Sequence, residues 1–250
     1  MSEQWVIFLE PKGSILDVVK AAHRRDFKTL CLSTNSLQTL PAPYHDMHRF
    51  ISKELISPPK MWQDNDRAIS FIEKHCPLEQ IVGTYSGVES SLSLNSALRM
   101  LTGLPCTPPA VIETLLDKLK VRQKLRQAGI SRLRALSGDE MASTDQWPFK
   151  GGAYFKPVRG TGSLCVTRIK DFAGLEKAKK EFNDREKLLA TVPGWISSYI
   201  SSDHRFFCEE EFPGELMSLE GITIDGQFKT LGLLSRILRS EEHTSELQSP

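Results

Sequence analysis

The chain has 250 residues, of which 40% are hydrophobic and 25% are charged, and this length suits one large domain or two modest ones. The composition is typical of a globular protein and excludes collagen-like, disulfide-scaffold and disordered chains. Lysine and arginine number 32 and aspartate and glutamate 31, so no excess of positive charge indicates a nucleic-acid surface.

Membrane, export and redox signals are weak. The apolar run at the start, Trp5–Leu9, is far shorter than the about 20 residues that a membrane span needs. The N-terminal Met-Ser-Glu-Gln lacks the basic region of a secretory signal. The five scattered cysteines form no Cys-x-x-Cys pair, which indicates a reduced chain without a zinc ribbon. We expect a cytoplasmic protein that binds neither membrane nor nucleic acid.

The first hundred residues alternate between strand and helix patterns. The predicted strands are Trp5–Leu9, Thr29–Ser33, a short one at Arg49–Ile51, and Glu79–Thr84. The predicted helices are Ser14–His23, Asp64–His75, and a third that begins at a capping box, Ser86–Glu89, and ends near Gly103. Such alternation predicts a parallel sheet with helical crossovers. The fold class is therefore α/β, with an open, Rossmann-like sheet over residues 1–105.

A second domain is predicted from residue 106 to residue 238, because Pro105, Pro108 and Pro109 mark a boundary. Three helices are predicted: one capped by Thr107, one over Asp117–Ala128 that stops at Gly129, and one capped by Asp171 that runs through Phe182. In the second of these, Leu119, Leu125 and Ala128 are expected to face inward. The predicted strands are Ser131–Leu136, Gly152–Val158, Leu164–Ile169, Arg205–Phe212, Ser218–Ile224 and Phe228–Leu234. A Ser-containing loop precedes Arg205, and Asp225-Gly226 predicts a hairpin turn.

The segment after residue 150 carries the strongest chemical signal. Lys156 lies inside an apolar strand, where a lysine is costly to bury without an anionic partner. The turn that follows consists of Gly160, Thr161, Gly162 and Ser163, and its glycines let backbone N–H groups form a concave anion site. Together they fit nucleotide phosphates. The alternative is a surface hairpin with its lysine at a sheet edge.

Other motifs flank this segment in a fixed order. Asp117-Lys118 opens a helix, Glu209-Glu210-Glu211 precedes Phe212-Pro213-Gly214, and Glu220 lies in the next strand. In this order and spacing, residues 3–238 resemble the ATP-grasp superfamily, most closely its carboxylate–amine ligases and more distantly its biotin-carboxylase-like members. The resemblance implies a Rossmann-like pre-ATP-grasp domain over 1–105. It also implies an incomplete α+β ATP-grasp domain over 106–238, with linker helices, a lid subdomain at about 145–212 and the start of a C-terminal subdomain.

The resemblance also implies roles for single residues. Lys118 and Lys156 would bind ATP phosphates, and residues 160–163 would be the mobile lid. Glu210 and Glu211, with the backbone through Phe212, would meet adenine and ribose, while Glu220 would approach the nucleotide from the next strand. Cys165 stands where the family often has glycine, and the hinge turn is about one residue short. These departures leave the lid details and the choice between the two glutamates open.

In this family ATP phosphorylates a carboxylate, and an amine then displaces phosphate from the acyl phosphate. The resemblance implies ATP and Mg²⁺ as cofactors and a small-molecule carboxylate and amine as substrates. The catalytic residues and the metal ligands are expected past Leu238, with no metal site before it, so we expect this fragment to be inactive. The alternatives are a non-catalytic nucleotide-binding module, a biotin-carboxylase-like enzyme and a dehydrogenase. The dehydrogenase is the least favoured, because this sequence lacks the Gly-rich fingerprint that such an enzyme would need after its first strand. The sequence leaves the oligomeric state open, with a homo-oligomer as one option.

The final residues resemble no protein pattern. Arg239–Ser249 match, over eleven consecutive residues, the translation of a common sequencing-library adapter. A polar disordered tail is the alternative. We therefore expect residues 239–250 to be foreign to the natural protein, whose own chain would continue past Leu238.

Overall fold

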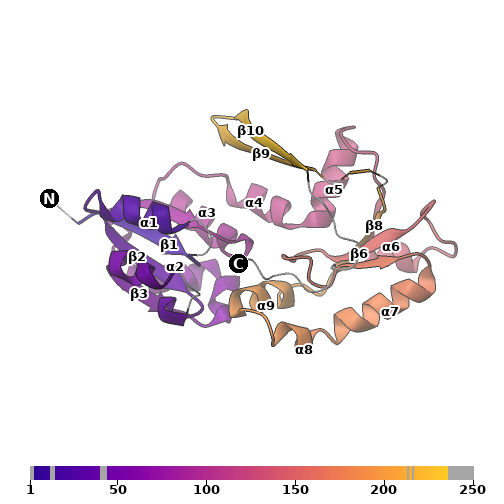
Figure 1. Ribbon diagram of the computed structural model, residues 1–250, viewed down its shortest axis with the longest axis horizontal. Helices are drawn as coiled ribbons and strands as arrows, with labels where there is room; N and C mark the ends of the chain where they lie inside the picture. Colours follow the sequence, from indigo (N-terminus) through magenta and orange to yellow (C-terminus); the bar gives the residue numbers. More distant parts are fainter. Residues whose placement is uncertain (1–2, 12–14, 40–43, 213, 216, 236–250) are drawn as a thin grey trace.

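The computed structural model describes residues 3–11, 15–39, 44–212, 214–215 and 217–235. Within these residues two α/β units are joined by the helices α4 (Pro109–Leu116) and α5 (Lys118–Gln127) (Figure 1). The predicted foreign tail at 239–250 and the predicted cap Ser14 lie outside the described residues. Across the described part of the chain, no helix has both the length and the apolar character to cross a membrane.

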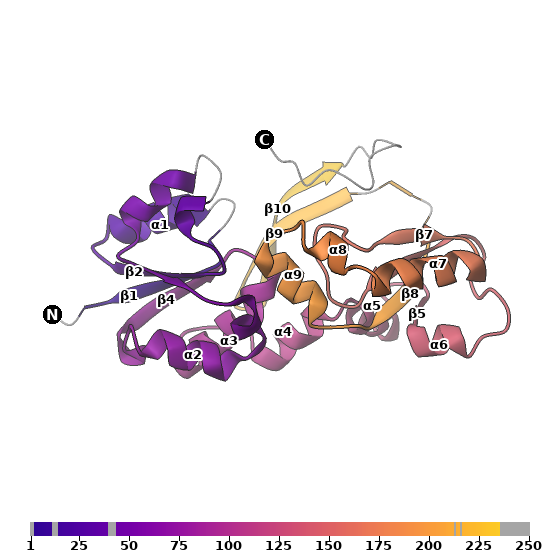
Figure 2. The ribbon, with the colours of Figure 1, turned by 90° about the horizontal axis from the view of Figure 1, so that it is seen from below.

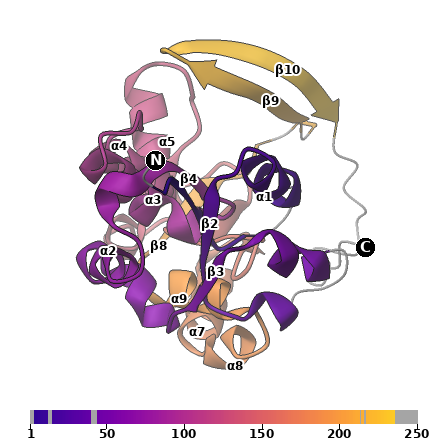
Figure 3. The same ribbon diagram turned by 90° about the vertical axis from the view of Figure 1, so that its left-hand side faces the viewer.

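The first unit is built on a parallel sheet, as the strand–helix alternation predicts. Its strands are β1 (Trp5–Leu9), β2 (Lys28–Ser33), β3 (Lys53–Ile56) and β4 (Ile81–Ser86), and within the described residues they pair in the order β3-β2-β1-β4. The helices are α1 (Ile15–His23), α2 (Asn65–Glu73) and α3 (Leu92–Leu101). Helix α1 covers one face of the sheet, and α2 and α3 cover the other (Figure 3).

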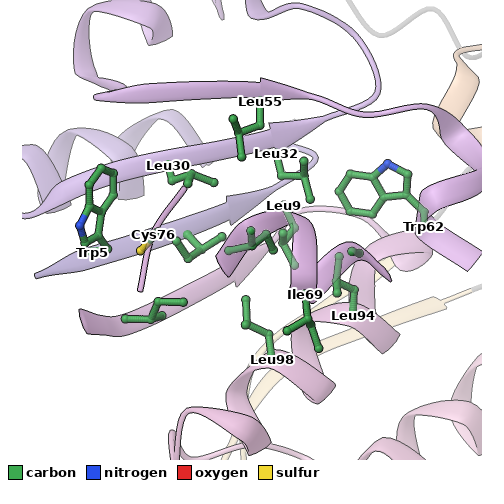
Figure 4. Close-up of a cluster of buried hydrophobic side chains, with 14 residues drawn as sticks. Trp5, Leu9, Leu30, Leu32, Leu55, Trp62, Ile69, Cys76, Leu94 and Leu98 are labelled. Atoms are coloured by element: carbon green, nitrogen blue, oxygen red, sulfur yellow. The ribbon is translucent and has the colours of Figure 1, made fainter. Parts of the chain in front are cut away.

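Both faces of this sheet are apolar, as is usual for parallel sheets between helices. On β1 the side chains of Ile7 and Leu9 pack toward α2 and α3, whereas Phe8 packs toward α1. Trp5 and Trp62 lie at opposite ends of the larger cluster (Figure 4). This alternation along a short apolar run explains why the strand forms and where it lies.

Two local predictions in the first unit are wrong. The short strand expected at Arg49–Ile51 is displaced to β3, and Arg49 belongs to a 3₁₀ helix, η2 (Tyr44–Phe50). The hydroxyl of Thr29 donates a hydrogen bond to the carbonyl of Phe50 at 2.6 Å, and this bond holds the end of η2 beside β2. The pairing of β3 with β2 therefore begins only at Lys53. The expected capping box is also absent from this described segment. Ser86 instead bonds within its own loop, and η5 (Glu89–Ser91) precedes α3.

The linker helices begin at different residues from those expected. No side chain caps α4, whose N-cap is Pro108, so the predicted cap at Thr107 is wrong. The oxygen of Asp117 accepts a hydrogen bond from the backbone of Lys120 at 2.9 Å and caps α5. As predicted, α5 stops at Gly129, whose φ is +70°. Ala128, expected inward, is exposed.

The second unit contains an antiparallel sheet. Its strands β5 (Ala135–Ser137), β6 (Ala153–Pro157), β7 (Thr167–Ile169) and β8 (Phe206–Glu210) pair in the order β5-β8-β6-β7 within the described chain. One face packs against α6 (Gly138–Ala142) and α7 (Phe172–Asn183) through a cluster that includes Phe155, Cys208 and Phe182. Asp171 caps α7 as predicted, since it accepts from the backbone of Gly174 at 2.8 Å.

The serine-containing segment before β8, predicted as a loop, forms the helices α8 (Glu186–Leu189) and α9 (Gly194–Ser201). Glycine and serine are poor helix formers, so the helix propensity of this segment does not predict a helix. Ile196 and Ile200 nevertheless pack with Leu189 in a small core. Tertiary burial therefore decides the conformation of α9.

The last described elements are the strands β9 (Met217–Ile224) and β10 (Gln227–Ser235), which form an antiparallel hairpin around Asp225 and Gly226. Both turn residues have positive φ, 50° and 76°, as a type I′ turn requires. The hairpin is a sheet of its own, set apart from the other two (Figure 1). The two predicted strands and their turn are confirmed.

Candidate functional site

One face of the β6–β8 pair is polar. Tyr154 and Lys156 alternate with the buried Phe155, so their side chains point away from the core that α6 and α7 cover. Glu209 lies opposite Tyr154 in the register and shares this face. The Lys156 ammonium lies 5.5 Å from the centre of the Tyr154 ring. A cation and a carboxylate thus meet on the open side of an otherwise apolar sheet.

Glu209 is the buried anion of this face. Its side chain is only 4% exposed and forms ion pairs with Lys156 and with Arg122 of α5. A buried carboxylate needs such partners, since an unpaired one is strongly destabilising. The sequence-based assignment chose Glu210 and Glu211 and missed Glu209. Strand alternation could have separated it from Glu210, because neighbouring strand residues face opposite ways and the apolar Cys208 faces the core.

Lys118 reaches the same end of the sheet. It is the first residue of α5, and its backbone N–H donates to the carbonyl of Val158 at 3.0 Å. Its ammonium donates to the carbonyl of Gly160 in the glycine loop. Burial lowers the pKa of Lys118, and the nearby charge of Lys156 lowers it further while Glu89 raises it. The structure therefore brings two lysines and the loop together, where an incoming anion would relieve their repulsion.

The glycine loop is held in an unusual backbone conformation. Gly160 is buried, Thr161 is half-buried, and Gly162 and Ser163 are exposed. Gly162, Ser163 and Cys165 have φ of 62°, 56° and 58°, a left-handed region that costs a non-glycine residue of order 1 kcal/mol. Cys165 is therefore a cysteine in a conformation that favours glycine, at the position where the resemblance leads one to expect glycine.

The predicted adenine and ribose residues line a separate cleft of about 750 Å³ together with the segment Gly129–Leu133. Glu211 pairs with Arg168 at 2.7 Å, and Glu210 accepts from the backbone of Arg134 at 3.4 Å. Phe212 is exposed. Neighbouring strand residues face opposite ways, so Glu211 lies on the polar face with Glu209, and Glu210 does not.

Glu220 lies apart from these groups. It is exposed on β9, in the separate hairpin, and outside the cluster of Lys118, Lys156 and Glu209 (Figure 1). Among the described residues, no group of three or more His, Cys, Asp or Glu side chains is arranged to hold a metal ion. What the structure assembles is a cationic site beside a glycine loop, next to a cleft at the end of β8.

No protein-family model matches the sequence, and no curated protein matches it. Solved structures do match, and they show the fold: the chain has the fold of the ATP-grasp ligases. An L-amino acid ligase from Bacillus licheniformis superposes with a TM-score of 0.68 at 16% identity, over 94% of this chain and 51% of that one.

Two synthetases are similar in the same way. N5-carboxyaminoimidazole synthetase from Staphylococcus aureus, complexed with ADP, matches with a TM-score of 0.60 at 13% identity, over 96% of this chain and 56% of that one. N5-carboxyaminoimidazole ribonucleotide synthetase from Thermotoga maritima matches with a TM-score of 0.56 at 15% identity, over 93% and 53%. The chain thus spans about half the length of these structures. The predicted fold class is confirmed.

Proposed function

We propose that this chain is the ATP-binding part of an ATP-dependent carboxylate–amine ligase. Lys118 and Lys156 hold the ATP phosphates, and residues 160–163 close over them. Residues 210–212 meet the adenine and ribose, and Glu220 approaches the nucleotide only if the hairpin moves. Residues 1–105 form the pre-ATP-grasp domain and 106–238 the partial ATP-grasp domain of a cytoplasmic protein that acts on small molecules.

The convergence of Lys118, Lys156 and the Gly160 loop carries this proposal. Two neighbouring lysines repel, and Glu209 compensates only part of their charge because Arg122 shares it. A triphosphate supplies the missing negative charge, and the backbone N–H groups of a glycine loop suit its oxygens. The ADP complex of a similar structure supports the same assignment.

The proposed reaction passes through an acyl phosphate. A substrate carboxylate oxygen attacks the γ-phosphorus of ATP, ADP leaves, and an amine then attacks the acyl carbon with release of phosphate. Phosphoryl transfer depends mostly on positioning and charge neutralisation, which is what the two lysines supply. Mg²⁺ would supply further neutralisation of phosphate charge, but the described residues offer no cluster of ligands for it, so we assign no step to the metal.

Nucleotide titration tests the proposal. We expect the chain to bind ATP with Mg²⁺, and Lys156→Gln and Lys118→Gln to weaken binding roughly tenfold or more, as loss of a charge-assisted hydrogen bond does. Lys150→Gln removes the same charge from an exposed loop before β6 and serves as the matched control. Unchanged ATP affinity in Lys156→Gln would overturn the proposal. Tighter binding of NADH than of ATP would favour a dehydrogenase.

A further inference from the structure

One cation of the polar face, Arg122, has no role in the proposed nucleotide site. It comes from helix α5, whereas Lys156 comes from β6, and both form ion pairs with Glu209 of β8. Helix α5 packs against β5, the strand that pairs with β8 (Figure 2). Among the described residues, neither cation forms an ion pair with another carboxylate. One buried carboxylate is therefore divided between a helix and a strand.

The two cations approach different oxygens of Glu209. Arg122 contacts Oε1 through its Nε atom, and the ammonium of Lys156 contacts Oε2. The carboxylate is 4% exposed, so water and salt do little to screen its charge. With both partners in place, the negative charge is spread over two cations, and neither is fully neutralised. Without Arg122, the whole charge of Glu209 would act on Lys156.

Arg122 also shares a helix face with Lys118. The two residues are four positions apart, a spacing that places side chains on the same side of a helix. The ammonium of Lys118 donates to the carbonyl of Gly160. Helix α5 is thus attached to the glycine loop through Lys118 and to the sheet through Arg122. The ion pair of Arg122 with Glu209 therefore holds α5 on the side of the sheet where Lys156 lies.

We propose that Arg122 is a positioning residue of the nucleotide site. It holds Glu209 from the helix side, so that Lys156 keeps enough charge to bind phosphate, and it does not itself contact the nucleotide. A phosphate oxygen and Glu209 compete for the same ammonium, and Arg122 weakens the competitor. This inference rests on the proposed function and deepens it, because it names the residue that regulates the charge of the site. The alternative is that Arg122 only neutralises a buried carboxylate and so only stabilises the fold.

Calorimetric titration of the full chain with ATP and Mg²⁺ tests this in a double-mutant cycle. Arg122→Gln should weaken ATP binding roughly threefold to tenfold, a usual size for coupling between contacting residues. The same substitution in a Glu209→Gln background should change the affinity by less than about twofold, because no carboxylate is left to compete for Lys156. Glu209→Gln alone should bind ATP at least as tightly as the native chain, although its fold is less stable.

Arg126→Gln is the matched control. It removes the same charge from the same helix, four positions beyond Arg122, at an exposed residue. Its effect on ATP affinity should stay below about twofold, since exposed charges are screened by water and salt. Arg122→Lys keeps a cation beside Glu209 and should retain most of the affinity. Thermal unfolding of each variant reports whether it is folded.

The proposal fails if Arg122→Gln weakens ATP binding equally in both backgrounds, or if Arg126→Gln or Arg122→Lys weakens it as much. It also fails if Glu209→Gln binds ATP less tightly than the native chain, and this comparison decides alone if Arg122→Gln does not fold. Lys156→Gln separates this failure from that of the proposed function. Affinity that falls in Lys156→Gln but not in Arg122→Gln would retain the nucleotide site and overturn the role of Arg122. Affinity unchanged in Lys156→Gln would overturn both.

Discussion

Replacement of Glu209 by glutamine tests whether the polar face of the β6–β8 pair is held together by one buried carboxylate. The change keeps the size of the side chain and removes its charge. Lys156, 24% exposed, and Arg122, 36% exposed, would then face each other across a neutral amide. We expect a clear loss of folding stability.

The magnitude follows from the burial of the three groups. Two unit charges 4 Å apart attract by about 4 kcal/mol at an effective dielectric constant near 20. Removal of one partner of a fully buried pair costs about 3–5 kcal/mol. Both cations keep some contact with water here, so about 2–3 kcal/mol is expected. For a chain of this size that lowers Tm by about 4–12 °C.

Urea unfolding of Glu209→Gln, Lys156→Met and the double variant measures the coupling between the two side chains. Lys156→Met should cost less than Glu209→Gln, because Glu209 keeps Arg122. Glu220→Gln, in the exposed hairpin, is the control for loss of a strand glutamate and should change stability by less than about 0.5 kcal/mol. Equal effects of Glu209→Gln and Glu220→Gln, or additive effects in the cycle, would refute the reasoning.

Three more predictions concern pH and backbone strain. Burial lowers the pKa of Lys118, so the unfolded chain binds more protons between that lowered value and 10.5, and stability rises with pH there. Lys118→Met should abolish this rise in unfolding curves, and a rise that persists would exclude Lys118 as its cause. Burial alone would raise the pKa of Glu113, but hydrogen bonds from Arg159 and Ser93 lower it, which stabilises the fold above about pH 4.5 and ceases to do so as pH falls through the folded-state value. Glu113→Gln should therefore flatten the acid limb of the stability profile, and an unaltered limb would contradict this. Ser163→Gly relieves a positive φ and should raise stability by up to about 1 kcal/mol, whereas Ser143→Gly, at a φ of −90°, should lower it. Chemical denaturation of both serine variants checks the difference in sign.

Much of the fold could be predicted from local pattern. Apolar runs such as Trp5–Leu9 predict the parallel sheet because burial on both faces demands continuous apolar strands. The cap Asp171 was predicted correctly, since its hydrogen bond is local, whereas Asp117, predicted as the first residue of its helix, is the cap of α5. Thr107 is not a cap, because the neighbouring prolines already fix the chain direction without a side-chain cap.

The errors lie where distant contacts decide. Helix α9 has a sequence of low helix propensity and forms because Ile196 and Ile200 find a core. The position of β3 depends on a hydrogen bond between Thr29 and Phe50 across the chain. Neither signal is local.

For the site, sequence order predicted that Lys118, Lys156 and the Gly160 loop would meet, and they do. Whether they bind ATP stays a prediction. The central role of Glu209 was missed because three consecutive glutamates look alike until strand register separates them. The cleft that Trp62 and Tyr199 line could not be predicted, since these two residues are 137 positions apart in the chain and carry no shared motif.

The β9–β10 hairpin has a practical consequence for work with this chain. Leu219, Ile222, Phe228, Leu231 and Leu233 are each about half exposed or more, so both faces of this two-stranded ribbon expose apolar side chains. Among the described residues, neither strand pairs with a third strand, and unpaired strand edges are sites of association. Concentrated samples should self-associate through this ribbon, which light scattering would detect as a growing particle size. Solubility of the purified protein would then depend on whatever surface shields those five side chains.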